Sequence, residues 1–146
     1  MTKLLSQEQV YQYHNSGFVS PIDVLKQDEI AHCIGEIESF ENYTGKAIDS
    51  PHKSRCYQLF SWADDLIHNP KILDAVEDII GPDILCYHAT LWVKPAKSNS
   101  FVRGHQDGTY FLSTQQNILL PGWPLQLPMK RQGACKLFQA TTKMIL

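Results

Sequence analysis

An imidazole and a carboxylate stand two residues apart at His105 and Asp107, within the stretch Phe101–Phe111. On a β-strand, residues i and i+2 point to the same face, so both side chains can converge on one cation while Gln106 points away. Together they supply two of the three ligands of the 2-His-1-carboxylate site, which holds Fe(II) and leaves positions open for a co-substrate and O₂. A histidine two residues before an aspartate also occurs by chance in many chains, so a surface or core role for His105 is the alternative.

A strand carrying this pair needs neighbouring elements to position it. Gly81 and Pro82 end a preceding helix, and the largely apolar segment Ile84–Lys94 predicts a strand that is buried on both faces. Ala96–Ser100 is then a loop that leads into the strand of His105.

The first half of the chain is predicted to be mainly helical. Ser6 and Gln9 form the pattern of a capping box, and Gly17 suits the end of the helix that follows. The other predicted elements are an extended segment from Phe18, a helix over Gln27–Asn42, a strand over Arg55–Phe60, a helix over Ser61–Asn69 and a helix from Pro70 to Ile80. Helices first and strands later indicate an α+β fold in which N-terminal helices buttress one face of a jelly-roll sheet.

Composition excludes several classes of protein. A chain of 146 residues is one domain or part of one, and a net charge of −2 gives no reason to propose nucleic acid or membrane partners. Four cysteines are scattered without the spacing of a zinc site or a disulfide framework, namely Cys33, Cys56, Cys86 and Cys135. The apolar start is too short for a signal peptide, and no apolar run approaches membrane-spanning length. A cytoplasmic location with reduced thiols is therefore expected.

Several motifs, in their order and spacing, resemble the phytanoyl-CoA dioxygenase family. They are GPDI at Gly81–Ile84, KP at Lys94–Pro95 and HQDGTYF at His105–Phe111. Members of the family typically show G-P-(D/N)-I, then K-P or K-x-P, then W-H-Q-D-x-x-Y-(W/F). The resemblance extends from about Ser6 to Leu119 and is most specific from Asp74 to Phe111.

The resemblance implies an Fe(II)- and 2-oxoglutarate-dependent hydroxylase. His105 and Asp107 match the family's iron ligands, and no catalytic residue beyond the metal ligands is implied. Lys53, Thr90 and Gln106 match positions at the co-substrate. The implied reaction consumes 2-oxoglutarate and O₂, gives succinate and CO₂, and hydroxylates a C–H bond of a small organic or acyl-CoA-type substrate.

Other roles are open for the three co-substrate residues. Lys53 is equally a solvated loop lysine, Thr90 a strand threonine and Gln106 an outward polar residue. Asp107 separates the chain from relatives that halogenate, in which a small residue at this position leaves room for chloride. The substrate itself is not selected by any residue of the chain, and neither is the oligomeric state.

The last quarter departs from the family pattern. Residues 120–131 hold three prolines, although a jelly roll needs its next strands here and proline is excluded from central strands. Codons that encode residues 120–145, read one nucleotide earlier, permit a product resembling the family's next two strands and its P-G-(S/T/N)-H turn. We therefore expect residues 1–119 to be the N-terminal part of the domain and residues 120–146 to be an out-of-frame tail. A divergent proline-rich loop is the alternative.

A fragment of this kind would hold an incomplete double-stranded β-helix and an incomplete metal site. The family's third ligand is a distal histidine, followed by an arginine that binds 2-oxoglutarate, but no histidine follows His105 and Arg131 is the only later arginine. The chain as written is therefore expected to be inactive. A non-catalytic cupin-like binding module and a cupin that binds another divalent metal are the alternative functions.

Overall fold

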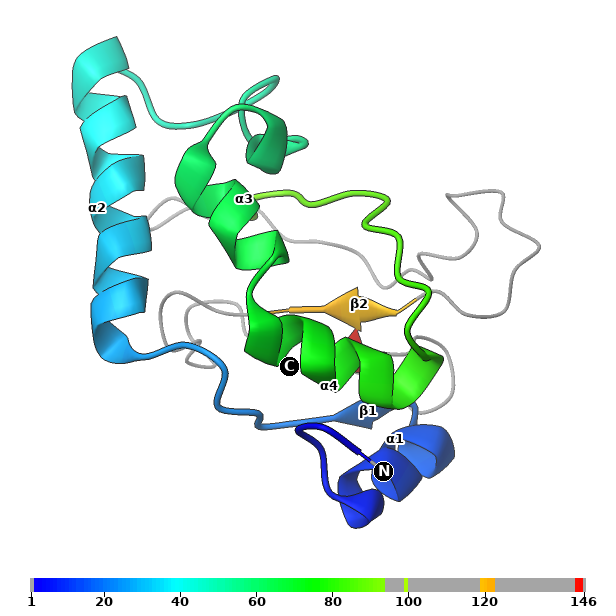
Figure 1. The fold of residues 1–146 in the computed structure, drawn as a ribbon. Helices are drawn as coiled ribbons and strands as arrows, with labels where there is room; N and C mark the ends of the chain where they lie inside the picture. The colour runs from blue at the N-terminus through cyan, green and yellow to red at the C-terminus, as the bar shows by residue number, and fades with distance from the viewer. Residues whose placement is uncertain (1, 94–98, 100–118, 123–143, 146) are drawn as a thin grey trace. The chain divides into compact units, whose positions relative to one another are not determined.

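The computed structural model describes residues 2–93, 99, 119–122 and 144–145 (Figure 1). These residues fall into two compact units, each considered by itself below. The first unit takes its described residues from Met1–Ile22, Asp74–Ile84 and Phe101–Leu146. The second takes them from Asp23–Leu73 and Leu85–Ser100.

Helix α1, Gln7–Ser16, begins and ends where the sequence predicts. The Gln9 backbone N–H donates to the Ser6 hydroxyl over 3.1 Å, and the Ser6 backbone N–H donates to the Gln9 side chain over 2.8 Å. This capping box satisfies N–H groups that the first turn of a helix leaves without partners. The helix ends at Gly17, whose φ of 82° lies in the left-handed region that glycine adopts without steric cost.

Three two-residue strands pair in parallel within the first unit, in the order β1-β3-β2. They are β1 (Phe18–Val19), β2 (Leu120–Pro121) and β3 (Met144–Ile145). The edge position of β2 suits Pro121, because proline has no N–H to donate to a second neighbour. Residues 123–143 of the predicted tail lie outside the described residues, as does the strand predicted around His105, so the jelly-roll fold stays a prediction.

Helix α2, Gln27–Thr44, and helix α3, Ser61–Ile67, lie against each other in the second unit (Figure 1). Aromatic side chains fill part of their contact. The Phe60 ring lies 5.1 Å from the Phe40 ring in an edge-to-face arrangement and 5.9 Å from the Trp62 ring in a stacked one, measured between ring centroids. Such pairs add to the stabilisation from burial alone, and Trp62 is buried.

Helix α4, Pro70–Ile80, has the bounds that the sequence predicts. The Asn69 side chain accepts a hydrogen bond from the Lys71 backbone N–H at 3.0 Å, which caps the helix ahead of Pro70. Gly81 ends it with a φ of 87°. The buried residues differ from the predicted apolar face of Leu73, Val76, Ile79 and Ile80, since only Val76 of that set is buried, together with Ile72 and Ala75.

Two strand predictions are wrong for the residues that the structure describes. Within Arg55–Phe60, residues Cys56–Gln58 form a 3₁₀-helix, η1, because Arg55 adopts a left-handed φ of 53° that breaks an extended chain. From Ile84 to Val93 the chain forms one isolated antiparallel bridge, between Ser54 and Thr90, and no longer strand. A strand needs a partner strand that pairs along its length, and the described residues supply this single bridge.

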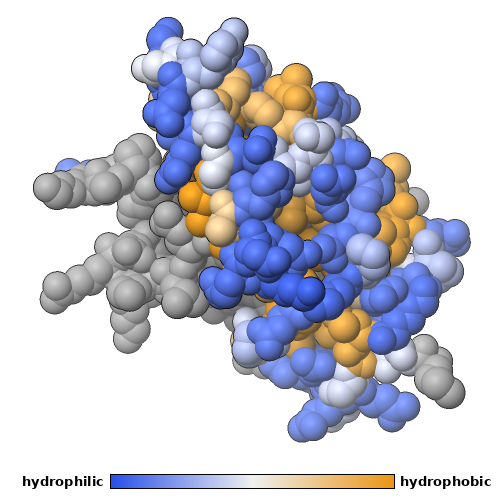
Figure 2. Space-filling view, turned by 60° about the vertical axis from the view of Figure 1, so that its left-hand side comes forward, coloured by the Kyte–Doolittle hydropathy of each residue, from blue (hydrophilic) through white to orange (hydrophobic). Residues whose placement is uncertain are grey.

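The segment Leu85–Val93 is accordingly open to solvent. Leu85 is 85% exposed and Trp92 is 79% exposed. The surface view likewise shows apolar side chains reaching the surface among hydrophilic ones (Figure 2). Within the described ranges, no helix combines the length and the apolar character needed to cross a membrane.

Candidate functional site

The predicted site residues divide between described and undescribed parts of the chain. His105, Gln106 and Asp107 lie outside the described residues. Lys53 and Thr90 are both described and both belong to the second unit. The local geometry can therefore be built around these two positions.

Backbone contacts bring Lys53 and Thr90 to one place. Ser54 and Thr90 form the isolated antiparallel bridge, and the Leu91 N–H donates to the Lys53 carbonyl oxygen over 2.9 Å. The turn that holds Lys53 is closed by its own N–H, which donates to the Asp49 carbonyl oxygen over 3.2 Å. Two residues distant in sequence thus lie on adjacent backbone segments.

The ammonium group of Lys53 already has an anionic partner. Its Nζ lies 2.5 Å from Oδ1 of Asp49, with the two side chains 39% and 73% exposed. The hydrogen bond from the Lys53 side chain, followed by one from the Ser50 backbone, holds the pKa of the Asp49 carboxyl below its ordinary value. Because exposed ion pairs contribute little net stability, a second carboxylate can compete with Asp49 for this lysine.

Thr90 also makes a polar contact through its side chain. Its Oγ1 lies 2.6 Å from Nε2 of His88, and the imidazole tautomer decides which of the two groups donates. His88 is exposed. A hydroxyl and an imidazole therefore stand next to the backbone of Lys53.

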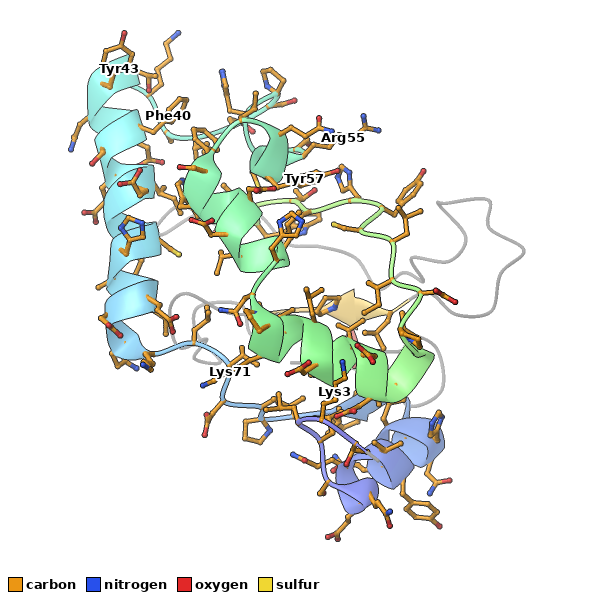
Figure 3. All side chains as sticks on the ribbon, viewed as in Figure 1. Lys3, Phe40, Tyr43, Arg55, Tyr57 and Lys71 are labelled. Carbon is orange, nitrogen blue, oxygen red and sulfur yellow. The ribbon has the colours of Figure 1, made fainter. Side chains whose placement is uncertain are left out.

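Sequence reasoning missed the partners of the two predicted residues. Asp49 is four residues before Lys53, and His88 is two residues before Thr90 on an extended segment, so both spacings were visible in the sequence. Arg55, which is exposed and carries the left-handed φ of 53°, is a further cation on the loop that follows Lys53 (Figure 3). None of these three was predicted as a site residue.

The ligand set for iron is incomplete. Among the residues that the structure describes, no group of three histidine, cysteine or acidic side chains is placed to hold a metal ion. His105 and Asp107 are the two predicted ligands, and the sequence contains no histidine after them. The described part of the chain therefore offers no complete three-ligand facial site.

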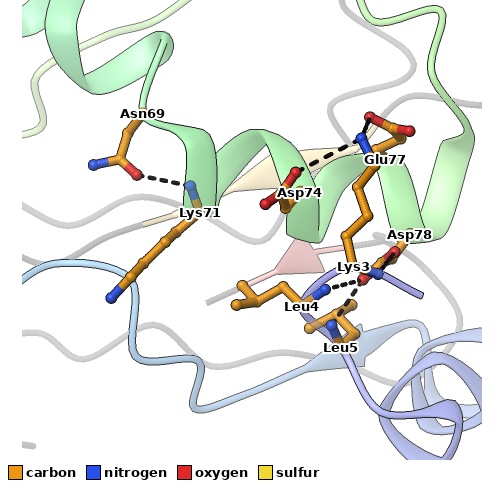
Figure 4. A network of polar contacts seen from close by, with 8 residues as sticks. All are labelled: Lys3, Leu4, Leu5, Asn69, Lys71, Asp74, Glu77 and Asp78. Atoms are coloured by element: carbon orange, nitrogen blue, oxygen red, sulfur yellow. Dashed lines mark hydrogen bonds and ion pairs between the residues drawn. The ribbon is translucent and has the colours of Figure 1, made fainter.

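A depression of about 230 Å³ lies elsewhere, in the first unit, lined by Thr2, Lys3, Glu77, Asp78 and Pro82. Its charged groups are paired with one another or with the backbone (Figure 4). The Nζ of Lys3 lies 2.7 Å from Glu77, and the Asp78 carboxylate accepts hydrogen bonds from the backbone N–H groups of Lys3, Leu4 and Leu5 at 2.7–2.8 Å. These contacts fasten the N-terminal segment to α4, so we assign the depression a structural role.

The chain matches no family model, no curated protein and no solved structure. The resemblance of the motifs between Gly81 and Phe111 is developed below as a proposal.

Proposed function

We propose that residues 1–119 are the N-terminal part of a phytanoyl-CoA-dioxygenase-like, Fe(II)- and 2-oxoglutarate-dependent hydroxylase. Its fold would be an incomplete double-stranded β-helix with buttressing N-terminal helices, and its substrate a small organic or acyl-CoA-type molecule. Residues 120–146 would be an out-of-frame tail. The motif series GPDI, KP and HQDGTYF, in the family's order and spacing, carries this proposal.

The geometry around Lys53 supports the proposal. A dicarboxylate co-substrate needs a cation and neighbouring hydrogen-bond donors, because charge-assisted hydrogen bonds are the strong ones. Lys53 supplies a half-exposed cation, and the Ser54–Thr90 bridge brings the backbone of Lys53 close to that of Thr90. For co-substrate to bind here, its carboxylate has to replace Asp49 at the ammonium group.

The iron itself cannot be assigned a working site in this chain. With two ligands in place of three, metal affinity and geometry are both impaired, so we derive no reaction step from it. We expect the 146-residue chain to give no measurable 2-oxoglutarate turnover.

A non-catalytic cupin-like binding module is the second candidate. The missing distal histidine favours it, since a chain that has lost a ligand can still use its scaffold for binding. The proposed cellular location and type of partner are the same for both candidates. We propose a cytoplasmic location, with a small-molecule substrate or ligand as partner.

The nucleotide sequence around codons 119 and 120 separates these candidates. If one nucleotide has been lost, restoring it yields a longer chain with a distal histidine and arginine. That product should bind Fe(II) and form succinate from 2-oxoglutarate and O₂, measured as succinate released and O₂ consumed. His105→Ala and Asp107→Ala in the restored chain should each abolish both signals, because each removes a metal ligand.

Two results would contradict the proposal. One is full turnover by the 146-residue chain, because the number of ligands argued above would then be wrong. The other is a coding sequence in which no single-nucleotide change yields the family's downstream motifs, which would favour the binding module.

A further inference from the structure

Two cysteines of the second unit contact neighbouring residues of the segment Leu85–Val93. Cys56 is on η1 and is 4% exposed, whereas Cys86 is an exposed residue of the segment Leu85–Val93. Both are free thiols. The Cys56 Sγ lies 3.9 Å from the carbonyl oxygen of Ala89, to which it donates, and the backbone N–H of His88 hydrogen-bonds the Cys86 side chain. The two sulfur atoms therefore contact backbone groups of neighbouring residues, Ala89 and His88.

Electrostatics agrees with this proximity. Burial raises the pKa of the Cys56 thiol, and Cys86 is close enough to raise it further through repulsion between the two thiolates. Burial also raises the pKa of Cys86, against the opposing effect of the His88 N–H. Both groups are thus mainly protonated at neutral pH, so the two side chains can approach each other without repulsion between like charges.

Of the two segments that carry the cysteines, Leu85–Val93 is held by fewer contacts than η1. A disulfide needs Cα atoms roughly 4.4–6.8 Å apart and Cβ atoms roughly 3.8 Å apart. Leu85–Val93 is attached through the Ser54–Thr90 bridge and the hydrogen bond to Lys53, and most of its side chains are exposed. The buried Cys56, by contrast, sits on η1, which contacts α3.

We propose that Cys56 and Cys86 form a reversible disulfide, a redox-modification site whose oxidant is a low-molecular-weight disulfide. The cross-link would fasten Leu85–Val93 to η1 and hold Lys53 beside Thr90. The proposal is independent of the hydroxylase assignment, because it needs only the two thiols and their surroundings.

The chemistry balances with the named oxidant. The Cys86 thiol loses its proton and its sulfur attacks one sulfur of the small disulfide, whose S–S bond breaks and releases one thiolate that takes up a proton. The Cys56 thiol then loses its proton and attacks the Cys86 sulfur, which releases the second small thiol in the same way. The protein loses two protons and two electrons in total, and the small disulfide takes them up and is reduced to two thiols.

Peptide mapping of the 146-residue chain tests the proposal directly. Trypsin places the four cysteines in four different peptides, 27–46, 56–71, 72–97 and 132–136. After treatment with oxidised glutathione and blocking of free thiols, we expect 56–71 linked to 72–97 as the dominant cross-linked species. Its mass should be two hydrogens below the sum of the two peptides, and dithiothreitol should separate them.

Three controls sharpen the result. Cys86→Ser should remove the linked species, and Cys33→Ser, on α2, should leave its yield unchanged. In denaturant, pairing should spread over all four cysteines, which shows that the native selectivity comes from the fold. The mapping of the unmodified chain does not depend on the folding of any variant. A different dominant pair, or Cys86 found only as the glutathione adduct, would overturn the proposal.

Discussion

At the scale of single residues, the ion pair between Lys53 and Asp49 determines what Lys53 can bind. Both side chains reach solvent, so their attraction is weakened by water and salt. The ion pair orients the Lys53 side chain but is weak enough for another anion to replace Asp49. In a restored hydroxylase, the same Asp49 would act as a competitor that the co-substrate displaces.

Opposite effects are therefore expected from changing the two partners in the frame-restored protein. Lys53→Ala should raise the KM for 2-oxoglutarate by roughly 10- to 150-fold, because a charged hydrogen bond contributes about 1.5–3 kcal/mol. Asp49→Asn should lower that KM or leave it unchanged, because it removes the competing anion. Iron content per chain should be unaffected in both variants. Loss of iron in Lys53→Ala would instead give this lysine a role in the metal site.

The Asp78 carboxylate is the second residue with an identifiable role. Burial acts to raise its pKa, but the N–H groups of Lys3, Leu4 and Leu5 and the charge of Lys3 outweigh it, so the pKa lies below its ordinary value. A carboxyl whose pKa is lowered in the folded state stabilises that state above its unfolded pKa of about 4. The stabilisation is lost as the pH falls through the lower, folded pKa.

Asp78→Asn should consequently lower the free energy of unfolding at pH 7 by about 1–2 kcal/mol. Below about pH 4 the difference from the unmodified chain should shrink, because the aspartate then becomes neutral as well. Asp74→Asn is the matched control, since Asp74 lies 3.8 Å from the Lys3 Nζ in an exposed pair and should change stability little. Urea unfolding at pH 7 and pH 3 measures both variants. Equal losses at the two pH values would contradict the argument.

At the scale of elements, local signals predicted helix ends well and strands poorly. Ser6 with Gln9, Gly17 and Gly81 act within a few residues of themselves, so their effect can be read from the sequence. A strand depends on partners far along the chain, and the apolar run Ile84–Lys94 carries no information about whether such partners are present. The left-handed conformation of Arg55, which starts η1, could not be predicted from residue propensities either, because arginine rarely adopts that conformation.

Replacement by alanine should have opposite effects on stability at Gly45, which ends α2, and at Gly35, which lies inside it. Gly45 ends the helix with a φ of 66°, so Gly45→Ala should destabilise the protein by roughly 1–2 kcal/mol. Gly35 lies inside the helix, and a Cβ there would meet no atom within 4 Å. Gly35→Ala should therefore stabilise it by roughly 0.5–1 kcal/mol. Thermal unfolding of the two variants checks the signs, and the same sign for both would refute the assigned end of α2.

At the scale of the whole molecule, the chain divides into two units that share helix α4 along the sequence. The second unit buries Trp62 on α3, which contacts η1 and α2. Trp62→Ala removes a large buried ring and should destabilise its surroundings by about 3–5 kcal/mol. Hydrogen exchange should then accelerate in α3 and η1 more than in α1, if the units open separately. Equal acceleration in α1 would show that they unfold as one.

The geometry of the candidate site could also be predicted only in part from the sequence. Family resemblance assigned Lys53 and Thr90 to one co-substrate site, and their backbone proximity depends on the chain reversing direction between them. No local pattern encodes that reversal. The residues with the strongest local signal, His105 and Asp107, are the ones that lie outside the described structure.

The anchoring of the N-terminus by Asp78 has a consequence for synthesis on the ribosome. The Lys3, Leu4 and Leu5 N–H groups leave the ribosome before Asp78, because the carboxylate that receives them is made 73–75 residues later. At ordinary translation rates this interval is roughly 4–15 seconds, during which those groups hydrogen-bond to water. Residues Lys3–Leu5 of the nascent chain therefore stay accessible to modifying enzymes and chaperones until α4 has emerged.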